Sequence, residues 1–285
     1  MIGPRMRFEK WQALGNDYLI VESGDLPWPL TPTRVRKICD PHRGVGSDGI
    51  LLLSPSEDPS YVAALRIFNP DGSEAELSGN GSRQAMIYLR SRGRVERDEF
   101  AILTAAGAIR ATISGRSSAA VDMGRAATRS KDFPSGAADG RGRLEAGGRS
   151  WSFQHVSIGN PQCAIAYEGL ETLELADVGP GIEHHPLFPN RTNVSWYRPL
   201  EPGVIRARIF ERGVGETLSS GTGACGAAIA HHLDGGPRKI VVALDGGELT
   251  VELGENLQVT LTGWAVPVCA GTLSDDFRKE LDETQ

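Results

Sequence analysis

Two turns of the sequence Ser-Gly-x-Gly could each begin a helix and bind an anion. They start at Ser78 and Ser220, and each leads into a stretch with helical character. The first N–H groups of a helix have no partner within it and lie at the positive end of the helix dipole. A carboxylate bound there is stabilised, and a carbon beside it becomes more acidic. Because serine is also a favoured N-cap residue, capping alone is the alternative interpretation.

The two turns belong to an internal repeat. Residues 66–87 and 208–229 are related by a constant offset of 142 residues and share nine identities without a gap. A capping serine need not copy its surroundings, so the repetition favours a shared function. We expect two related halves whose turns face each other, with Ser78 and Ser220 on opposite sides of one carbon atom.

Period-two alternation of polar and apolar residues dominates both halves, which is typical of β-strands. Alternating segments recur in the same order, for example at 107–113 and 247–253. Helices are expected from about 80 to 92 and from about 222 to 233, and each pattern ends near a glycine. The sequence therefore predicts an α+β fold of two pseudo-symmetric lobes, each a curved, mostly antiparallel sheet around a central helix.

Changes in composition suggest where the lobes begin and end. Residues 128–150 are rich in Gly, Ser, Ala and charge, as expected of a connection. The expected parts are an N-terminal lobe at 7–127, this connection, a C-terminal lobe at 151–272 and a charged tail at 273–285. A short helix is expected in the tail, from 274 to 281.

Composition narrows the class of protein. The 285 residues carry a net charge of −6, which argues against nucleic acid or an anionic membrane as the main partner. No apolar run approaches the roughly 18 residues of a membrane span, and the first ten residues lack the apolar core of a signal peptide. The four cysteines contain no CxxC pair and indicate reduced thiols. We expect a cytoplasmic protein with a small-molecule partner; a homodimer is compatible with the sequence.

Cofactor-binding patterns are absent or incomplete. The six histidines show no spacing typical of a metal site. Residues 44–49 and 221–226 fit Gly-x-Gly-x-x-Gly, but the first leads into a strand pattern and the second lies far from the preceding strand. A dinucleotide fingerprint needs a strand directly before it and a helix after it. No cofactor is therefore expected.

With these turns in view, the chain resembles the diaminopimelate epimerase family of cofactor-independent amino-acid racemases and epimerases. The resemblance runs in order over roughly residues 7–272. It rests on seven segments: 14–18, 44–48, 68–74, 78–83, 159–161, 191–194, and 211–217 with 221–225. It implies two pseudo-symmetric domains that clamp the substrate between them. It also implies inversion of the α-carbon of LL-diaminopimelate to the meso form by proton transfer at two faces, a step toward lysine and peptidoglycan precursors.

The resemblance assigns substrate-binding roles by position. They fall on Asn16, Asn69, Asn160 and Asn193, on the pair Glu211-Arg212, and on a backbone carboxylate cradle at Gly79-Asn80 and Gly221-Thr222. These types suit a zwitterion, because arginine can bind a carboxylate with two hydrogen bonds and glutamate can bind an ammonium. Turn formation is the alternative for the asparagines, and a solvated ion pair is the alternative for Glu211-Arg212.

The sequence departs from the family pattern at the positions of proton transfer. The family's two catalytic cysteines are Ser78 and Ser220 here, and the histidine that assists one thiol is Gln162. A glutamine that contacts substrate aligns with Gly49. An engineered exchange of two cysteines would not explain Gln162 or Gly49, so the pattern favours a natural variant subgroup.

These departures predict weak or altered catalysis. A thiol near pKa 8.5 can be tuned toward neutral pH at a helix N-terminus, whereas a hydroxyl is far less acidic. Gln162 cannot act as a base, although Glu211 could act toward one serine. Cys163 and Cys225 are expected to point into the core and not to replace the missing thiols. Two alternatives remain: an inactive amino-acid-binding homologue, and a different isomerase or lyase that uses Glu211 as its base.

Overall fold

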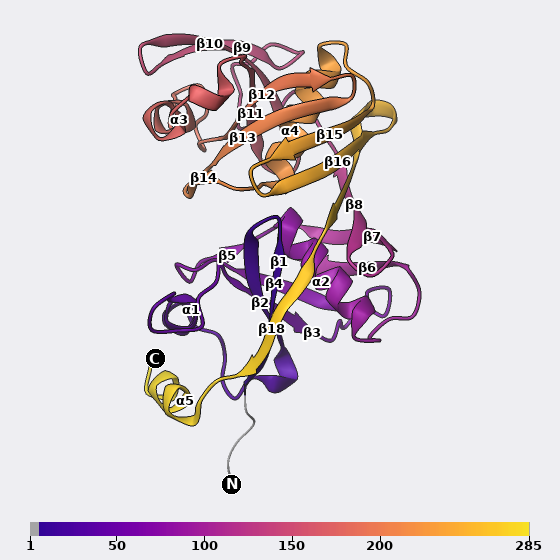
Figure 1. Ribbon diagram of the computed structural model, residues 1–285, viewed down its shortest axis with the longest axis vertical. Helices are drawn as coiled ribbons and strands as arrows, with labels where there is room; N and C mark the ends of the chain where they lie inside the picture. The colour runs from indigo at the N-terminus through magenta and orange to yellow at the C-terminus, as the bar shows by residue number, and fades with distance from the viewer. Residues whose placement is uncertain (1–5, 285) are drawn as a thin grey trace. The chain divides into compact units, whose positions relative to one another are not determined.

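The structure, a computed structural model, describes residues 6–284 and consists of two compact units (Figure 1). Unit 1 contains the described residues up to Val121 and those from Trp264 onward, and unit 2 runs from Asp122 to Gly263. The chain therefore passes between the units twice. Residues 1–5, which belong to the segment expected to lack a signal peptide, and residue 285 of the expected tail lie outside the described residues.

Unit 1 is a mostly antiparallel sheet with a central helix. Its strands are β1 (Arg7–Ala13), β2 (Asn16–Glu22), β3 (Ile50–Ser54), β4 (Ala64–Phe68), β5 (Glu74–Ala75), β6 (Glu99–Thr104), β7 (Gly107–Ser114), the first part of β8 (Ser118–Arg125), and β18 (Val266–Thr272). Its helices are α1 (Pro32–Cys39), α2 (Gly79–Ser91) and α5 (Asp275–Asp282), with a 3-10 turn η1 (Ser23–Asp25). The strands pair in the order β18-β1-β2-β3-β4-β6-β7-β8, with β5 also on β4. Among these described pairs, β2–β3 and β4–β6 are parallel and the others are antiparallel.

Unit 2 repeats this arrangement. Its strands are β9 (Arg141–Ala146), β10 (Arg149–Ser157), β11 (Pro161–Ala166), β12 (Asn193–Glu201), β13 (Val204–Glu211), β14 (Gly215–Thr217), β15 (Lys239–Leu244), β16 (Gly247–Leu253) and β17 (Gln258–Trp264). Its helices are α3 (Leu175–Glu183) and α4 (Gly221–Leu233), with 3-10 turns η2 (Leu170–Thr172) and η3 (Glu255–Leu257). The order β9-β10-β11-β12-β13-β15-β16-β17, with β14 on β13, again contains two parallel pairs, β11–β12 and β13–β15. The predicted α+β fold with two lobes of like topology is confirmed.

The two central helices are buried because their sequences are small and apolar where they meet the sheets. Helix α2 packs on β1, β2, β3, β4 and β7, and helix α4 packs on β10, β11, β12, β13, β15 and β16. Ala85, Ile87 and their repeat partners Ala227 and Ile229 are at most 1% exposed. Burying such side chains contributes about 25 cal/mol for each Å² of apolar surface removed from water. The helices therefore hold their N-terminal turns in fixed positions.

The limits of the lobes differ from those expected in two places. The segment expected to be only a connection contains β9, which pairs with β10 across a hairpin at Gly147 and Gly148. Both glycines have positive φ, 59° and 69°, the conformation that a tight hairpin turn requires. Strand β18, expected in the C-terminal lobe, pairs with β1 in unit 1. The tail helix is present as α5, and Ser274 is its N-cap.

Each unit has its own apolar core, and three of the four cysteines are buried. Cys39 lies in the core of unit 1 and Cys163 in that of unit 2, while Cys225 is fully buried in α4. None of the four cysteines, all of which the structure describes, is in a disulfide, and Cys269 is the exposed one. Burial raises the pKa of the Cys163 thiol well above its ordinary value. Cys163 is thus an unreactive core residue, as the sequence predicts.

Candidate functional site

Ser220 lies at the N-terminus of α4 and has a carboxylate beside it. Its extended backbone (φ −138°, ψ 125°) makes it the N-cap, and its Oγ accepts a hydrogen bond of 3.2 Å from the Gly223 N–H. The same Oγ donates a hydrogen bond of 2.9 Å to Glu211 Oε2. Ser220 is only 3% exposed. The serine is therefore both a cap and the partner of a carboxylate.

Glu211 is the last residue of β13 and is held by two hydroxyl groups. Thr217 Oγ1 donates to its Oε1 at 2.9 Å, and Ser220 donates to its Oε2. Thr217 lies on β14, the strand that returns antiparallel to β13 and leads into α4. Two donors fix the carboxylate plane and leave the charged form stabilised. The short hairpin thus brings a potential base to the helix N-terminus.

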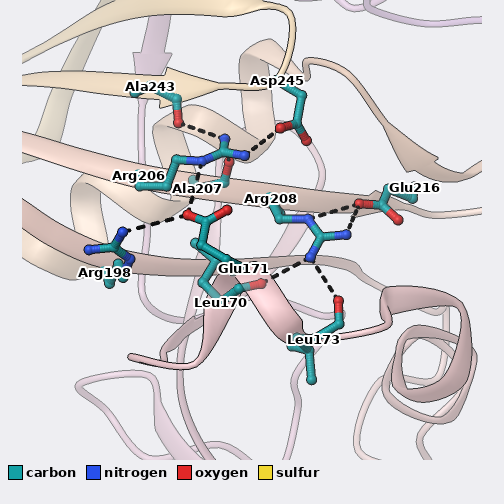
Figure 2. Close-up of polar contacts among 10 residues, drawn as sticks. All are labelled: Leu170, Glu171, Leu173, Arg198, Arg206, Ala207, Arg208, Glu216, Ala243 and Asp245. Atoms are coloured by element: carbon teal, nitrogen blue, oxygen red, sulfur yellow. Dashed lines mark hydrogen bonds and ion pairs between the residues drawn. The ribbon is translucent and has the colours of Figure 1, made fainter.

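An arginine network braces this hairpin. In Figure 2 the Arg208 guanidinium lies between Glu216 and the carbonyl oxygens of Leu170 and Leu173. Its Nη1 donates to the two carbonyls at 2.9 and 2.7 Å, and its Nη2 donates to Glu216 Oε1 at 2.6 Å. The nearby Arg206 bonds to Asp245 and is paired with Glu171. The brace joins β13, β14 and η2, and so limits movement of the strand that carries Glu211.

Asparagine and glutamine side chains surround the same end of α4. Asn160 Nδ2 donates to Thr222 Oγ1 at 3.2 Å, and Gln162 Nε2 donates to Asn160 Oδ1 at 2.7 Å. Gln162 is fully buried, and its Oε1 has no hydrogen-bond partner among the described residues. The carboxamide of Gln162 therefore orients Asn160, which in turn contacts the first turn of the helix.

Asn193 and Arg212 are tied to each other through the backbone. Asn193 Oδ1 accepts from the Arg212 N–H at 2.9 Å, and its Nδ2 donates to the Pro161 carbonyl at 3.0 Å. Arg212 Nη1 donates to the Asn190 carbonyl at 3.0 Å. Asn193 thus fixes the backbone from which the Arg212 side chain extends.

Ser78 occupies the equivalent place in unit 1 but has different neighbours. It caps α2 with φ −136° and ψ 119°, and its Oγ accepts from the Gly81 N–H at 3.0 Å. Its second contact is the Tyr18 hydroxyl, which lies 3.4 Å from Ser78 Oγ. The repeat position of Glu211 is Asn69, whose Nδ2 donates to Ser73 Oγ at 2.9 Å. Unit 1 therefore has an amide where unit 2 has a carboxylate.

Two further asparagines of unit 1 are held by charged side chains. Asn16 Nδ2 donates to Asp48 Oδ2 at 2.8 Å, and Asp48 also accepts from the Asp17 N–H at 2.9 Å. Burial raises the pKa of the Asp48 carboxyl, against the lowering effect of these hydrogen bonds. In the first turn of α2, the buried Asn80 accepts from Arg83 Nη2 at 2.8 Å. Asp48 thus orients Asn16.

The residues expected from the sequence divide between the two units, and within unit 2 hydrogen bonds connect several of them: Glu211 with Ser220, Asn160 with Gln162 and Thr222, and Asn193 with Arg212. Those of unit 1 are Asn16, Asn69, Ser78, Gly79 and Asn80, and those of unit 2 are Asn160, Gln162, Asn193, Glu211, Arg212, Ser220, Gly221 and Thr222. Sequence reasoning gave no role to Tyr18, Asp48 or Thr217. Each of the three is the last residue of a motif segment (14–18, 44–48 and 211–217), and this position was the only sign of a role. That Ser78 and Ser220 act on one carbon stays a prediction.

The described part of the chain offers neither a cluster of metal ligands nor a helix that could span a membrane. Residues 6–284 hold no group of three or more His, Cys, Asp or Glu side chains placed to bind a metal ion. No helix among them combines the length and the apolar composition needed to cross a membrane.

Structural comparison supports the fold alone. A Bacillus anthracis phenazine biosynthesis protein of the PhzF family superposes with a TM-score of 0.70 at 20% identity, covering 94% of this chain and 99% of that one. A hydroxyproline epimerase from Agrobacterium vitis superposes with a TM-score of 0.68 at 18% identity, covering 96% and 94%. These proteins share the architecture of two lobes.

Sequence comparison places the chain in a family. The diaminopimelate epimerase family model matches residues 8–128 and 154–268. Diaminopimelate epimerase 2 of a Nostoc species is 38% identical over 277 residues, covering 95% of this chain and 97% of the relative. The diaminopimelate epimerase of Pelotomaculum thermopropionicum is 40% identical over 276 residues, covering 93% and 98%. The match extends over both units and includes every candidate site residue, and the chain therefore belongs to the diaminopimelate epimerase family of enzymes.

Proposed function

We propose that the chain is a diaminopimelate epimerase-like isomerase, which inverts the α-carbon of LL-diaminopimelate to give the meso form. Family membership supports the reaction class, and the names of its relatives support the substrate. The observation that carries the proposal is the hydrogen bond of 2.9 Å between Ser220 Oγ and Glu211 Oε2 at the N-terminus of α4. Ser220 stands where the resemblance places a cysteine, and this bond puts a base directly beside it.

Substrate binding follows from the groups present. The Arg212 guanidinium binds a carboxylate, and the amides of Asn160 and Asn16 supply further donors and acceptors. The Gly221 and Thr222 N–H groups, at the start of α4, receive the carboxylate next to the reacting carbon. A carboxylate whose charge is shared with these donors makes the adjacent α-proton easier to remove.

Proton removal at Ser220 uses Glu211 as the final acceptor. The α-carbon–hydrogen bond breaks, its proton moves to Ser220 Oγ, and the original hydroxyl proton passes to Glu211 Oε2. The electron pair stays on the α-carbon beside the bound carboxylate. This relay avoids a free alkoxide, which would be costly because each unit of pKa mismatch is worth about 1.4 kcal/mol.

Ser78 serves as the proton donor at the other face. Both of its side-chain contacts use the oxygen as acceptor, so its own proton is available for the carbon. Its hydroxyl has no carboxylate like Glu211 beside it. We therefore expect slower turnover than in a member of the family with two cysteines.

The test is incorporation of deuterium at the α-carbon in heavy water, with LL- and meso-diaminopimelate, followed by NMR. Glu211→Gln should lower the exchange rate about 1,000-fold, within the range found for loss of a general base. Glu252→Gln, a change in an exposed ion pair on β16, is the matched control and should leave the rate unchanged. Exchange by Glu211→Gln at the parent rate would refute the role of this carboxylate.

A second candidate function follows from the different hydrogen-bond partners of the two serines. Because only Ser220 has a carboxylate partner, exchange could proceed at one face alone, as in an isomerase or lyase with a single base. Chiral chromatography of the exchanged substrate separates the two outcomes. Deuterium with inversion supports the epimerase, and deuterium with retention or a new unsaturated product supports the single-base enzyme. Ligand-induced thermal stabilisation without exchange by the parent or by a Ser78→Cys, Ser220→Cys variant would indicate an amino-acid-binding homologue.

A further inference from the structure

Tyr18 is the group that contacts the catalytic serine of unit 1 from the sheet. It lies on β2, is 6% exposed, and places its hydroxyl 3.4 Å from Ser78 Oγ. The Gly81 N–H occupies one lone pair of that oxygen. A phenol, with an ordinary pKa near 10, is a much better hydrogen-bond donor than an alkyl hydroxyl. The phenol therefore donates to Ser78, and such contacts often shorten when a ligand binds.

Gly49 provides the space in which the Tyr18 ring lies. A Cβ at position 49 would lie 2.1 Å from the Phe68 carbonyl oxygen and 2.8 Å from Tyr18 Cε1. Its φ of 153° also lies where side chains are strained. Any larger residue, including the glutamine that aligns here, would have to displace the tyrosine or the strand. The absence of a side chain at Gly49 therefore allows Tyr18 to contact Ser78.

We propose that Tyr18 is the positioning and proton-relay residue for Ser78, the counterpart in unit 1 of Glu211 in unit 2, and that Gly49 is required for its placement. This inference rests on the proposed function. When Ser78 gives its proton to the α-carbon, its O–H bond breaks and a C–H bond forms. The phenol proton then moves to Ser78 Oγ, and the phenolate regains a proton from water. Tyr18 itself acts only through the serine.

The first test measures the contact without using catalysis. A Ser78→Cys variant places a titratable thiol at this point, and Cys269→Ser removes the one exposed native thiol. The rate of alkylation by iodoacetamide against pH gives the thiol pKa. Adding Tyr18→Phe should raise that pKa by about one unit, because a hydrogen bond to the thiolate is lost. An unchanged pKa would overturn the proposal, whatever the protein catalyses.

The second test measures turnover in the native serine background. Tyr18→Phe keeps the ring and should lower the inversion rate about tenfold, with little change in KM and an altered alkaline limb of the pH profile. Tyr88→Phe is the matched control, since it removes another hydroxyl from unit 1, one that bonds to Glu22 at 2.8 Å. Equal rates in the parent and Tyr18→Phe would contradict the relay while leaving the proposed function intact. Absence of exchange in the parent and in the two-cysteine variant would refute the function, and the thiol titration would still decide on Tyr18.

The third test concerns Gly49. Gly49→Ala should reproduce the slower turnover of Tyr18→Phe, and combining the two changes should add little, because both disturb one contact. Gly107→Ala is the control: its φ of 108° is also positive, but a Cβ there meets nothing within 4 Å. If Gly49→Ala and Tyr18→Phe multiply their effects, the glycine acts independently of the tyrosine and that part of the proposal is wrong.

Discussion

The N-terminal turns of α2 and α4 have nearly the same backbone but different chemistry. Ser78 and Ser220 differ by 2° in φ and 6° in ψ, and each accepts a hydrogen bond from the N–H three residues later. The differences lie in what reaches the serine from the sheet, a phenol in unit 1 and a carboxylate in unit 2. The repeat therefore shares the capped helix start, while the partner of the serine hydroxyl differs between the two units.

The hydroxyl groups of the two serines therefore have different hydrogen-bonding roles. Ser220 donates a hydrogen bond to Glu211, and Ser78 accepts one from Tyr18. A thiol pair can exchange these roles because its pKa lies close to neutral pH. A pair of hydroxyls needs fixed partners, and the two units supply different ones.

Introducing a thiol at one serine position at a time tests directly whether the two serines differ in catalysis. Ser78→Cys should raise the inversion rate about 100-fold, because a thiol is more acidic than a hydroxyl by several pKa units. Ser220→Cys should raise it only about tenfold, since Glu211 already assists that serine. The rates are measured by α-deuterium incorporation with chiral analysis. Equal gains at both positions would show that Glu211 gives Ser220 no advantage.

The acid sensitivity of the two units should also differ. His155 is fully buried in unit 2, where its Nε2 lies 2.9 Å from Ser130 Oγ, and burial lowers its pKa to about 4. An unfolded histidine binds a proton near pH 6.5, so the unfolded state takes up more protons than the folded state below that pH. Stability from neutral His155 is present above pH 6.5 and is lost as pH falls toward 4. Unit 1 has only His42, which is exposed.

The measurement is the free energy of unfolding from urea titrations between pH 7.5 and 5. The parent should lose about 2 kcal/mol over this range from His155 alone. His155→Gln should have a flatter dependence, and His42→Gln is the control that should not differ from the parent. An unchanged slope in His155→Gln would mean that another group governs the acid response.

Features that depend on neighbouring residues or on the internal repeat could be predicted from the sequence. Both central helices begin one residue from their expected starts, because a serine followed by glycine marks the N-cap in each case. Pairing between strands that are far apart in the sequence was harder to predict. Strand β18 joins β1, its partner more than 250 positions earlier, and was therefore assigned to the wrong half. In unit 2 the expected residues Glu211 and Ser220 are in contact, but in unit 1 the contact of Tyr18 with Ser78 spans 60 positions and no spacing rule predicts it.

The smallest expected effect is the difference in stability between variants that lack one or the other capping serine. Ser78→Ala and Ser220→Ala each remove a cap, which should cost about 1 kcal/mol of unfolding free energy. Ser220→Ala also removes a donor at 2.9 Å from the Glu211 carboxylate, whereas Ser78→Ala also removes a longer contact, 3.4 Å, with the neutral Tyr18 hydroxyl. Because hydrogen bonds to charged groups are the stronger ones, the Ser220 variant should lose about 1 kcal/mol more. Urea titrations of both variants measure this difference, and Ser78→Asn, which can still cap, should recover most of the first loss. If the two alanine variants were equally stable, the bond between Ser220 and Glu211 would contribute no more to folding than the contact between Tyr18 and Ser78.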